Sequence, residues 1–444
     1  MDLQHILRPY LVFASMPLMN PKSQVKFLNS PYTLLIRLSL LLALVGGFGL
    51  GLYMLLGLSF GVPLMGMVPA LMQVHGHVQL VGFIALFILA AGSRLAPSVF
   101  TTRLQEPALL ATAAMYLAVG VALRAVAQPM PLVAARPLWL ILSGILELAG
   151  ALLALYSFQR TVGWERIKRL HKHVFLLTST IVLAVALALI LNLAATAELA
   201  RGSSVVRHDL DEALLHLGLW GFAATVVLAV GRRLFPRFLF LRPTRQRLMG
   251  YALAFWALGG ITVPAAWLIY PNSSAARVPG LLAQLAGAVM YLAALRLYSA
   301  PLRDSGRPKI TNPTRNWARV AFGFLAGAAA LNLGLSGYEA MGGFVGVGAV
   351  SATRHMLAQG FLLPVIVFMA ARLLPGYASL MVQRPRTLGI MVWCLFLAAL
   401  LRTFGELLGG YWWPWNIAAM LGGTLATSVF IVFALMVWRT SGRR

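Results

Sequence analysis

The sequence contains very little cysteine and very few acidic residues. A single cysteine, Cys394, stands among 444 residues, which excludes a disulfide framework, a covalent CxxCH attachment motif and a cysteine-ligated cluster. Only 11% of the residues are charged, and only 11 acids face 36 lysines and arginines. A chain that is also 60% hydrophobic cannot present the polar surface of a soluble domain. These shortages indicate a polytopic membrane protein.

Apolar stretches of about 20 residues, long enough to cross a bilayer as a helix, recur along the whole chain. No polar block is left over for a separate soluble domain. We therefore expect an all-α protein with one membrane domain over residues 1–444, surrounded by the lipid bilayer. The stretches predict twelve transmembrane helices, at 31–58, 72–96, 106–128, 136–158, 171–197, 210–234, 248–270, 278–299, 317–340, 350–373, 386–408 and 414–438.

The net charge of +25 is distributed very unevenly over the loops. When the loops are assigned alternately to two sides, the side that holds the N-terminus takes 28 of the 36 basic residues. Lysine and arginine are retained on the cytoplasmic side during insertion, so both termini are predicted to be cytoplasmic. Membrane topology accounts for the excess charge, and no nucleic-acid partner is predicted.

One motif, H-x4-G-F-x10-R-L-x-P, occurs three times. It begins at His77 in "HVQLVGFIALFILAAGSRLAP", at His216 in "HLGLWGFAATVVLAVGRRLFP" and at His355 in "HMLAQGFLLPVIVFMAARLLP", and the spacing is 139 residues both times. Such a period predicts three pseudo-equivalent units of four helices, at approximately 31–160, 170–300 and 315–440.

The motif has a physical interpretation. From histidine to proline is about 30 Å of helix, so the arginine reaches the inner surface and the proline is expected to end the helix just beyond it. The glycines of the Gly-Phe pairs, Gly82, Gly221 and Gly360, allow a neighbouring helix or a flat ligand to approach the backbone closely. The three histidines then lie at one depth in the outer half of the membrane. Polar groups in lipid are costly and usually functional, which favours a role for them.

A fourth histidine, His75, precedes His77 by two positions. Residues two apart on a helix point about 200° apart, so the two imidazoles are expected to face different sites. One would pair with His355 and the other with His216. Imidazoles are common metal ligands, and two of them on different helices can hold a b-type haem in an apolar interior. A second site with fewer protein ligands could hold copper or another haem. The candidate metal ligands are His75, His77, His216 and His355.

Twelve helices in three four-helix arcs, with histidines on the second, sixth and tenth, resemble subunit I of the haem-copper oxidases. The H-x-H before a Gly-Phe pair, followed later by "LHLGLWGF" and "RHMLAQGF", is more similar to the NnrS family. That family comprises twelve-helix membrane haem- and copper-containing proteins linked to the bacterial nitric oxide response. The resemblance implies haem, possible copper and a bacterial or archaeal cytoplasmic (inner) membrane.

The sequence also departs from the oxidases. The seventh helix, "YALAFWALGGITVPAAWLIY", has no His-His pair, the sixth has no His-Pro-Glu-x-x-Tyr, and the tenth has one histidine in place of two. The three-histidine copper site of an oxidase is therefore not encoded in the same way, and oxygen reduction coupled to proton pumping is not expected.

Four further residues are candidates, each with an alternative structural role. Arg354 could bind haem propionates or meet lipid headgroups at the membrane boundary. Glu147, at mid-span, could relay protons or hydrogen-bond a ligand, or be a protonated structural residue. His208 and Glu212 share a helix face with His216 and could form a metal or proton entry, although acids also cap helix N-termini.

Three functions remain open from the sequence. The first is redox or gas-ligand chemistry at haem, as in an oxidoreductase that receives electrons from a periplasmic donor or another membrane subunit. The second is proton-coupled transport, against which the parallel three-by-four repeat argues because common twelve-helix transporters consist of two six-helix halves. The third is a metal chaperone or an assembly factor for a haem-copper enzyme.

Overall fold

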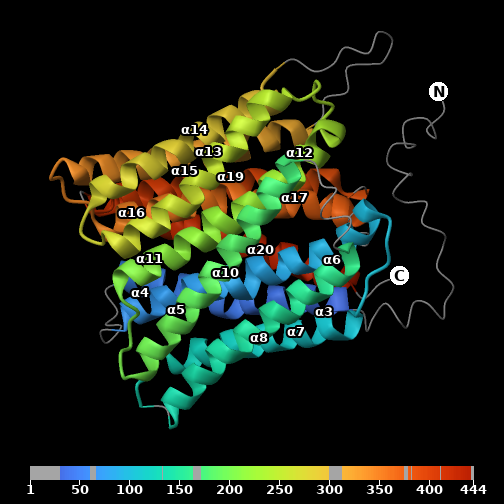
Figure 1. Cartoon of the computed structure of the whole chain (residues 1–444). Helices are drawn as coiled ribbons and strands as arrows, with labels where there is room; N and C mark the ends of the chain where they lie inside the picture. The colour runs from blue at the N-terminus through green and yellow to red at the C-terminus, as the bar shows by residue number, and fades with distance from the viewer. Residues whose placement is uncertain are drawn as a thin grey trace, which may run out of the picture.

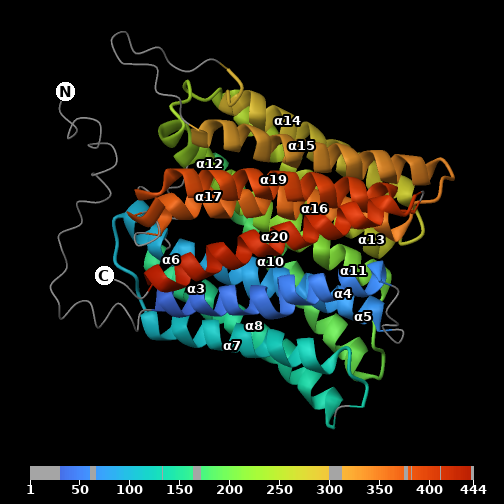
Figure 2. The same cartoon turned by 180° about the vertical axis from the view of Figure 1, so that it is seen from behind.

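A computed structural model describes residues 31–60, 67–132, 134–163, 172–299, 313–374, 379–381, 383–410 and 412–441. Every regular element in this part of the chain is a helix, and the long helices run side by side in one bundle (Figure 1). Seen from behind, the start of α3 and the end of α20 lie at the same end of the bundle (Figure 2).

Twelve helices are long and apolar enough to cross a membrane, as the hydropathy pattern predicts. Four of them contain a π-helical segment (η) and are therefore divided into several elements. The first six spans comprise α3 (Pro31–Leu42), η1 (Ala43–Gly49) and α4 (Leu50–Ser59); α5 (Val68–His77), η2 (Val78–Ala85) and α6 (Leu86–Phe100); α7 (Pro107–Ala127); α8 (Arg136–Val162); α10 (Lys172–Ala200); and α11 (His208–His216), η3 (Leu217–Ala224) and α12 (Thr225–Phe238).

The remaining six spans complete the bundle. They comprise α13 (Gln246–Ile269); α14 (Ser274–Leu295); α15 (Pro313–Ala340); α16 (Val347–Leu357), η4 (Ala358–Leu362) and α17 (Leu363–Leu373); α19 (Pro385–Leu408); and α20 (Pro414–Ser441). The spans that carry His216 and His355 are the most enclosed of the twelve. The hairpins α7–α8, α13–α14 and α19–α20 make the most extensive contacts between helices.

Several helices begin with a proline, and several end at or near a residue with positive φ. Prolines occupy the first turns of α5, α7, α8 and α19, where their missing N–H is not needed. Two prolines of the repeated motif do not end their helices as we expected, and the third, Pro375, lies outside the described residues. Pro97 lies inside α6 and Pro236 inside α12, and each helix stops one turn later, near the left-handed residues Thr101 and Phe240. Proline removes only its own N–H, so the carbonyls of Pro97 and Pro236 still accept hydrogen bonds from the residues that follow.

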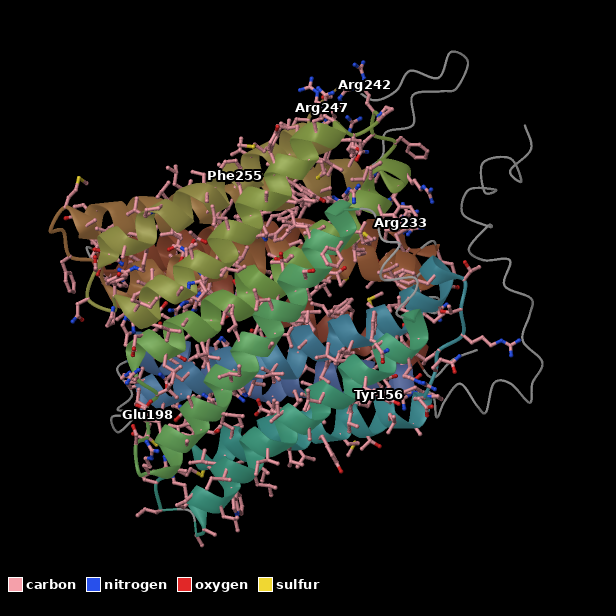
Figure 3. The ribbon with its side chains drawn as sticks, in the orientation of Figure 1. Tyr156, Glu198, Arg233, Arg242, Arg247 and Phe255 are labelled. Carbon is pink, nitrogen blue, oxygen red and sulfur yellow. The ribbon has the colours of Figure 1, made fainter. Side chains whose placement is uncertain are left out.

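Arginines gather at one end of the bundle. Figure 3 shows Arg233, Arg242 and Arg247 at one end and Glu198 at the other. This separation follows from alternate crossing of the twelve spans. It places the motif histidines in the half of the bundle that lies away from the arginines.

Candidate functional site

A π-helical segment follows each of the three motif histidines. His77 and His216 are the last residues of α5 and α11, and η2 and η3 begin at the next residue. His355 is followed by η4, which starts three residues later. Each segment contains the Gly-Phe pair of the motif. A π-helix has an extra residue in its turn and often occurs at functional sites. The repeat therefore encodes an irregularity of the backbone beside each histidine.

The glycines of these segments pack against neighbouring helices. A Cβ atom added to Gly82 would lie 3.2 Å from Leu42, and one added to Gly221 would lie 3.1 Å from Ala184. At Gly360 the added atom would lie 2.4 Å from Cδ1 of Phe324 on α15. These three positions, which we considered as ligand-approach sites, bring helices close to the histidine-bearing spans.

His75 and His355 face a common region between the first, second, tenth and eleventh spans. His75 lies within electrostatic range of His355, Arg402 and Glu406. Gly51 on α4 leaves room for the His75 ring, since a Cβ atom there would be 2.7 Å from Cε1. The structure therefore brings together one histidine of the "VHGHV" pair and the histidine of the third repeat.

Both imidazoles are oriented in the same way. His75 Nδ1 donates to the carbonyl oxygen of Gly47 on η1, at 2.9 Å. His355 Nδ1 lies 2.8 Å from Oε2 of Glu406 on α19. A carbonyl and a carboxylate only accept, so each Nδ1 carries the proton and each Nε2 keeps its lone pair. No described residue provides a hydrogen-bond partner for either Nε2.

A short polar chain supports His355. Ser351, one turn earlier on α16, donates to Oε1 of Glu406 at 3.0 Å, and Arg402 lies 2.7 Å from the same carboxylate. Arg402 and Glu406 are both on α19, one turn apart. The two bonds hold Glu406 toward the imidazole, which in turn fixes the plane of the ring. This is the arrangement in which a carboxylate orients a histidine ligand and increases its basicity.

Arg354 is paired with a carboxylate in this structure. It forms an ion pair with Glu212 on α11, and His208 Nδ1 lies 3.8 Å from the same residue. The side chain of His208 is 74% exposed, so the His208–Glu212 pair lies at the outer surface of the bundle. At the start of α11, Arg207 donates to Asp209 at 2.7 Å, and this hydrogen bond raises the pKa of the Arg207 guanidinium. Ion pairs thus account for the charges of Arg207, Asp209, Glu212 and Arg354 at the start of α11.

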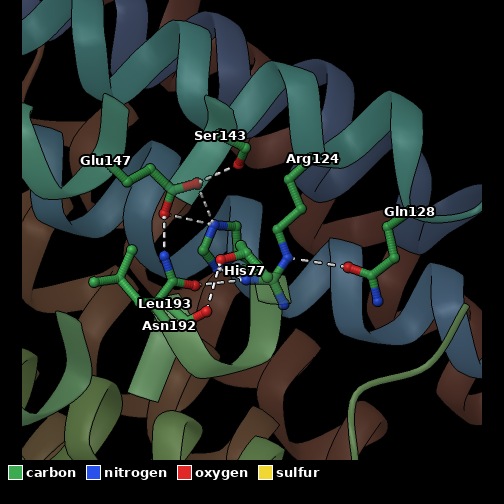
Figure 4. A network of polar contacts seen from close by, with 8 residues as sticks. His77, Arg124, Gln128, Ser143, Glu147, Asn192 and Leu193 are labelled. Carbon is green, nitrogen blue, oxygen red and sulfur yellow. Dashed lines mark hydrogen bonds and ion pairs between the residues drawn. The ribbon is translucent and has the colours of Figure 1, made fainter. Parts of the chain in front are cut away.

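His77 belongs to a second polar cluster on the opposite side of α5. Its Nε2 is 3.0 Å from Oε1 of Glu147 on α8, and its Nδ1 is 3.4 Å from Nη1 of Arg124 on α7 (Figure 4). Because Nε2 donates to the carboxylate and Nδ1 faces a donor, both nitrogens of His77 are engaged. Glu147 and Arg124 are almost fully buried, at 2% exposure each.

Asn192 closes this cluster. Its amide nitrogen donates to Oε2 of Glu147 at 2.9 Å, and its carbonyl oxygen accepts from Arg124 at 2.6 Å. Ser143 donates to Glu147 at 3.1 Å, and Arg124 donates to Gln128 at 3.0 Å (Figure 4). Glu147 therefore has partners from three helices, as expected for a satisfied charge inside a membrane.

His216 does not join either cluster. It is buried, stacks on Trp220 at a centroid distance of 5.9 Å and contacts the backbone of Gly259 on α13. Its Nε2 has no hydrogen-bond partner in the described part of the chain. The structure does not bring His77 and His216 together.

A cavity of about 890 Å³ opens beside His77. The second to sixth spans and the tenth span line it. His77, Arg124, Glu147 and Asn192 lie at one end of it. His75, His216 and His355 are not among its lining residues.

Four residues that build the two clusters were not predicted from the sequence: Arg124, Asn192, Arg402 and Glu406. Arg124 and Arg402 lie near the ends of apolar stretches, where an arginine is expected to be a loop charge. The sequence nevertheless contained a signal, the spacing of these residues. Arg402 follows Arg124 by 278 residues, which is twice the 139-residue period, and Glu406 follows Gln128 by the same interval. Two histidines thus have an arginine in the equivalent place on the next helix.

The described residues contain no group of three or more His, Cys, Asp or Glu side chains that could hold a metal ion. The pair His75 and His355 instead offers two imidazole nitrogens from different helices. Two imidazoles from different helices are a donor set of the kind that holds haem iron in proteins. A copper centre with three protein ligands does not fit the described side chains.

The fold is similar to that of a known class of membrane proteins. One chain of a cryo-electron microscopy structure of a haem-copper terminal oxidase dimer superposes with a TM-score of 0.62 at 12% sequence identity. The match covers 93% of this chain and 84% of that one. No protein-family model and no curated relative matches the sequence. The protein therefore has a fold similar to that of a haem-copper oxidase chain, at low sequence identity.

Proposed function

We propose that this protein is a membrane haem protein in which His75 and His355 would hold a b-type haem. The observation that carries the proposal is the orientation of the two rings. Each Nδ1 donates to a fixed acceptor, Gly47 or Glu406, so each Nε2 is the nitrogen available to iron. The oxidase-like fold supports the proposal, because it is a scaffold that can enclose haem between spans.

The chain's own residues would bind and orient the group in three ways. The Gly51 backbone leaves space for the His75 ring, Glu406 holds the His355 ring, and Arg402 balances the charge of Glu406. Arg354 interacts electrostatically with Glu406. Its guanidinium has enough donors to bind a haem propionate while it pairs with Glu212. A haem held by these residues would supply one-electron redox chemistry and an iron that can bind a gas such as nitric oxide.

The proposed role is accordingly an oxidoreductase or gas-responsive redox protein of the cytoplasmic membrane. Electrons would be exchanged with a periplasmic donor or another membrane subunit. The NnrS-like pattern of the three histidine-bearing helices supports the nitric oxide connection. Copper is not part of the proposal, because the described side chains offer no three-ligand group.

An absorption spectrum of the purified protein, oxidised and then reduced with dithionite, tests the proposal. We expect a b-type Soret band and α band, with haem quantified as the pyridine haemochrome. His75→Ala and His355→Ala should each lose most of the haem. His77→Ala, only two residues from His75, should retain it, because both nitrogens of His77 are engaged with protein groups.

The control separates ligand loss from unfolding. All three variants should elute from size exclusion as the parent does. If His77→Ala loses haem and His75→Ala keeps it, the ligand assignment is wrong. If the folded parent is colourless after growth with haem precursors, the haem proposal itself fails.

Proton-coupled transport is the second candidate. The His77–Glu147 pair at the end of a large cavity favours it, since buried histidine and carboxylate pairs are typical of proton relays in membranes. A colourless but folded protein that acidifies vesicles on addition of a solute would support this candidate over the haem protein.

A further inference from the structure

The cavity beside His77 is long and narrow. On the sixth span alone its lining extends from Asp211 to Phe235, which is about 36 Å of helix. Spread over that length, a volume of about 890 Å³ gives a mean cross-section of about 25 Å². This shape suits one extended chain better than a compact ligand, and the volume is within the range of small-molecule sites.

The walls of the cavity are apolar along most of its length, and its ends are polar. Side chains such as Leu80, Ala151, Leu189 and Val226 line the middle. The end that lies away from the arginine-rich end of the bundle holds His77, Glu147, Arg124 and Asn192, which are joined by hydrogen bonds. A ligand that fills this cavity therefore needs a polar head at one end and an apolar chain behind it.

The cavity opens sideways between α8 and α10. Leu155 on α8 and Val182 on α10 line the cavity and are also 38% and 46% exposed on the surface of the bundle. Both residues are nearer to the arginine-rich end of their helices than to the other end. In a bilayer this surface meets lipid chains and not water. The ligand is therefore expected to enter from the membrane.

The charges at the polar end do not favour an anionic head group. One arginine, Arg124, lies with two acids, Glu147 and Asp211, and Asp211 also interacts with Arg124. A phosphate or carboxylate would meet no excess of positive charge there. A neutral head that both donates and accepts hydrogen bonds matches the carboxylate, imidazole and amide groups that line this end.

We propose that this cavity is a binding site for a neutral, membrane-soluble molecule with a hydrogen-bonding head and one apolar chain. The head lies at His77 and Glu147, and the chain extends past Ala151 toward the opening between α8 and α10. Two kinds of membrane molecule share this chemistry, a quinone with a ring head and a glyceride with a hydroxyl head. The site is distinct from the region of His75 and His355 and does not depend on haem binding.

The test uses the full-length protein, as purified, in phosphatidylcholine nanodiscs. Three probes are compared: a decyl-substituted benzoquinone, a monoacylglycerol with one unsaturated chain, and palmitate. The amount of probe retained per disc after size exclusion is measured by mass spectrometry, and the amount in empty discs is subtracted. We expect saturable retention of the benzoquinone or the glyceride, with about one probe molecule per protein. The probe that binds identifies which of the two kinds of membrane molecule the cavity takes. Palmitate should be retained at least about tenfold more weakly.

Two matched variants locate the probe. Ala151→Phe fills the cavity, whereas Leu152→Phe, on the adjacent residue, enlarges a side chain that is 54% exposed and does not line the cavity. Ala151→Phe should abolish retention and Leu152→Phe should leave it unchanged. Glu147→Gln should weaken it about tenfold, because a hydrogen bond to a charged group is replaced by a neutral one.

Three outcomes would overturn the inference. Retention that never exceeds that of empty discs means the cavity binds none of these molecules. Equal retention of palmitate means that a neutral head is not selected. The third is that Arg232→Ala lowers retention and Glu147→Gln does not. In that case a phospholipid or fatty acid occupies the cavity with its head group at the arginine-rich end.

Discussion

At the scale of single residues, the partner of a histidine decides what the histidine can do. His75 and His77 are two positions apart, but one donates to a carbonyl oxygen and the other to a carboxylate that is itself held by Asn192. The sequence predicted that the two rings face opposite sides, because helical geometry alone fixes this angle. It could not predict the partners, because Gly47 and Glu147 come from other helices and are defined only by tertiary packing.

Of the residues near the proposed haem, Glu406 should have the strongest effect on its absorption spectrum or its midpoint potential. A carboxylate that accepts from Nδ1 increases the basicity of the ligand nitrogen and stabilises ferric iron over ferrous. Glu406→Gln should therefore raise the midpoint potential of the bound haem and weaken haem affinity by about 10-fold or more. Redox titration of the purified variant measures the potential. Glu339→Gln, at a half-exposed carboxyl that pairs with Arg277, is the control and should leave the potential unchanged. An unchanged potential in Glu406→Gln would remove this residue from the site.

At the scale of elements, the twelve spans were predictable because hydropathy is a local property of about 20 residues. The π-helical segments were not predicted, although all four contain a Gly-Phe pair, Gly47-Phe48 in η1 and the motif pair in the other three. Nothing in composition distinguishes a π turn from an α turn. The glycines of these segments pack against residues of other helices, such as Phe324 against Gly360, which the local sequence does not contain.

Gly360→Ala should destabilise the protein because its added Cβ atom would lie 2.4 Å from Phe324 Cδ1. Overpacking of this kind costs about 1–3 kcal/mol. Gly334→Ala is the matched control on α15, where nothing lies within 4 Å of the added atom and alanine favours helix by about 1 kcal/mol. Thermal unfolding in detergent should show a lower Tm for Gly360→Ala and an equal or higher Tm for Gly334→Ala. Equal Tm values for parent and Gly360→Ala would mean that Phe324 moves aside at no cost.

At the scale of the whole molecule, the arginine-rich loops and the histidine clusters lie toward opposite ends of the bundle, which predicts its orientation in the membrane. The loops that hold Arg233, Arg242 and Arg247 lie at one end of the bundle, and the polar histidine clusters lie toward the other (Figure 3). The positive-inside rule predicts that the arginine-rich end faces the cytoplasm. The proposed haem ligands and the polar end of the cavity would then be in the outer half of the membrane. A periplasmic electron donor could approach that face.

Single-cysteine labelling tests this orientation because the chain has only one cysteine to remove. In a Cys394→Ser background, Asn272→Cys marks the exposed turn between α13 and α14, and Pro243→Cys marks the exposed loop before α13. A membrane-impermeant maleimide added to intact spheroplasts should label Asn272→Cys at once. It should label Pro243→Cys only after permeabilisation, because that loop belongs to the arginine-rich end. The reverse pattern would place both chain termini outside, turn the histidine clusters toward the cytoplasm and require the electron donor to be a cytoplasmic protein.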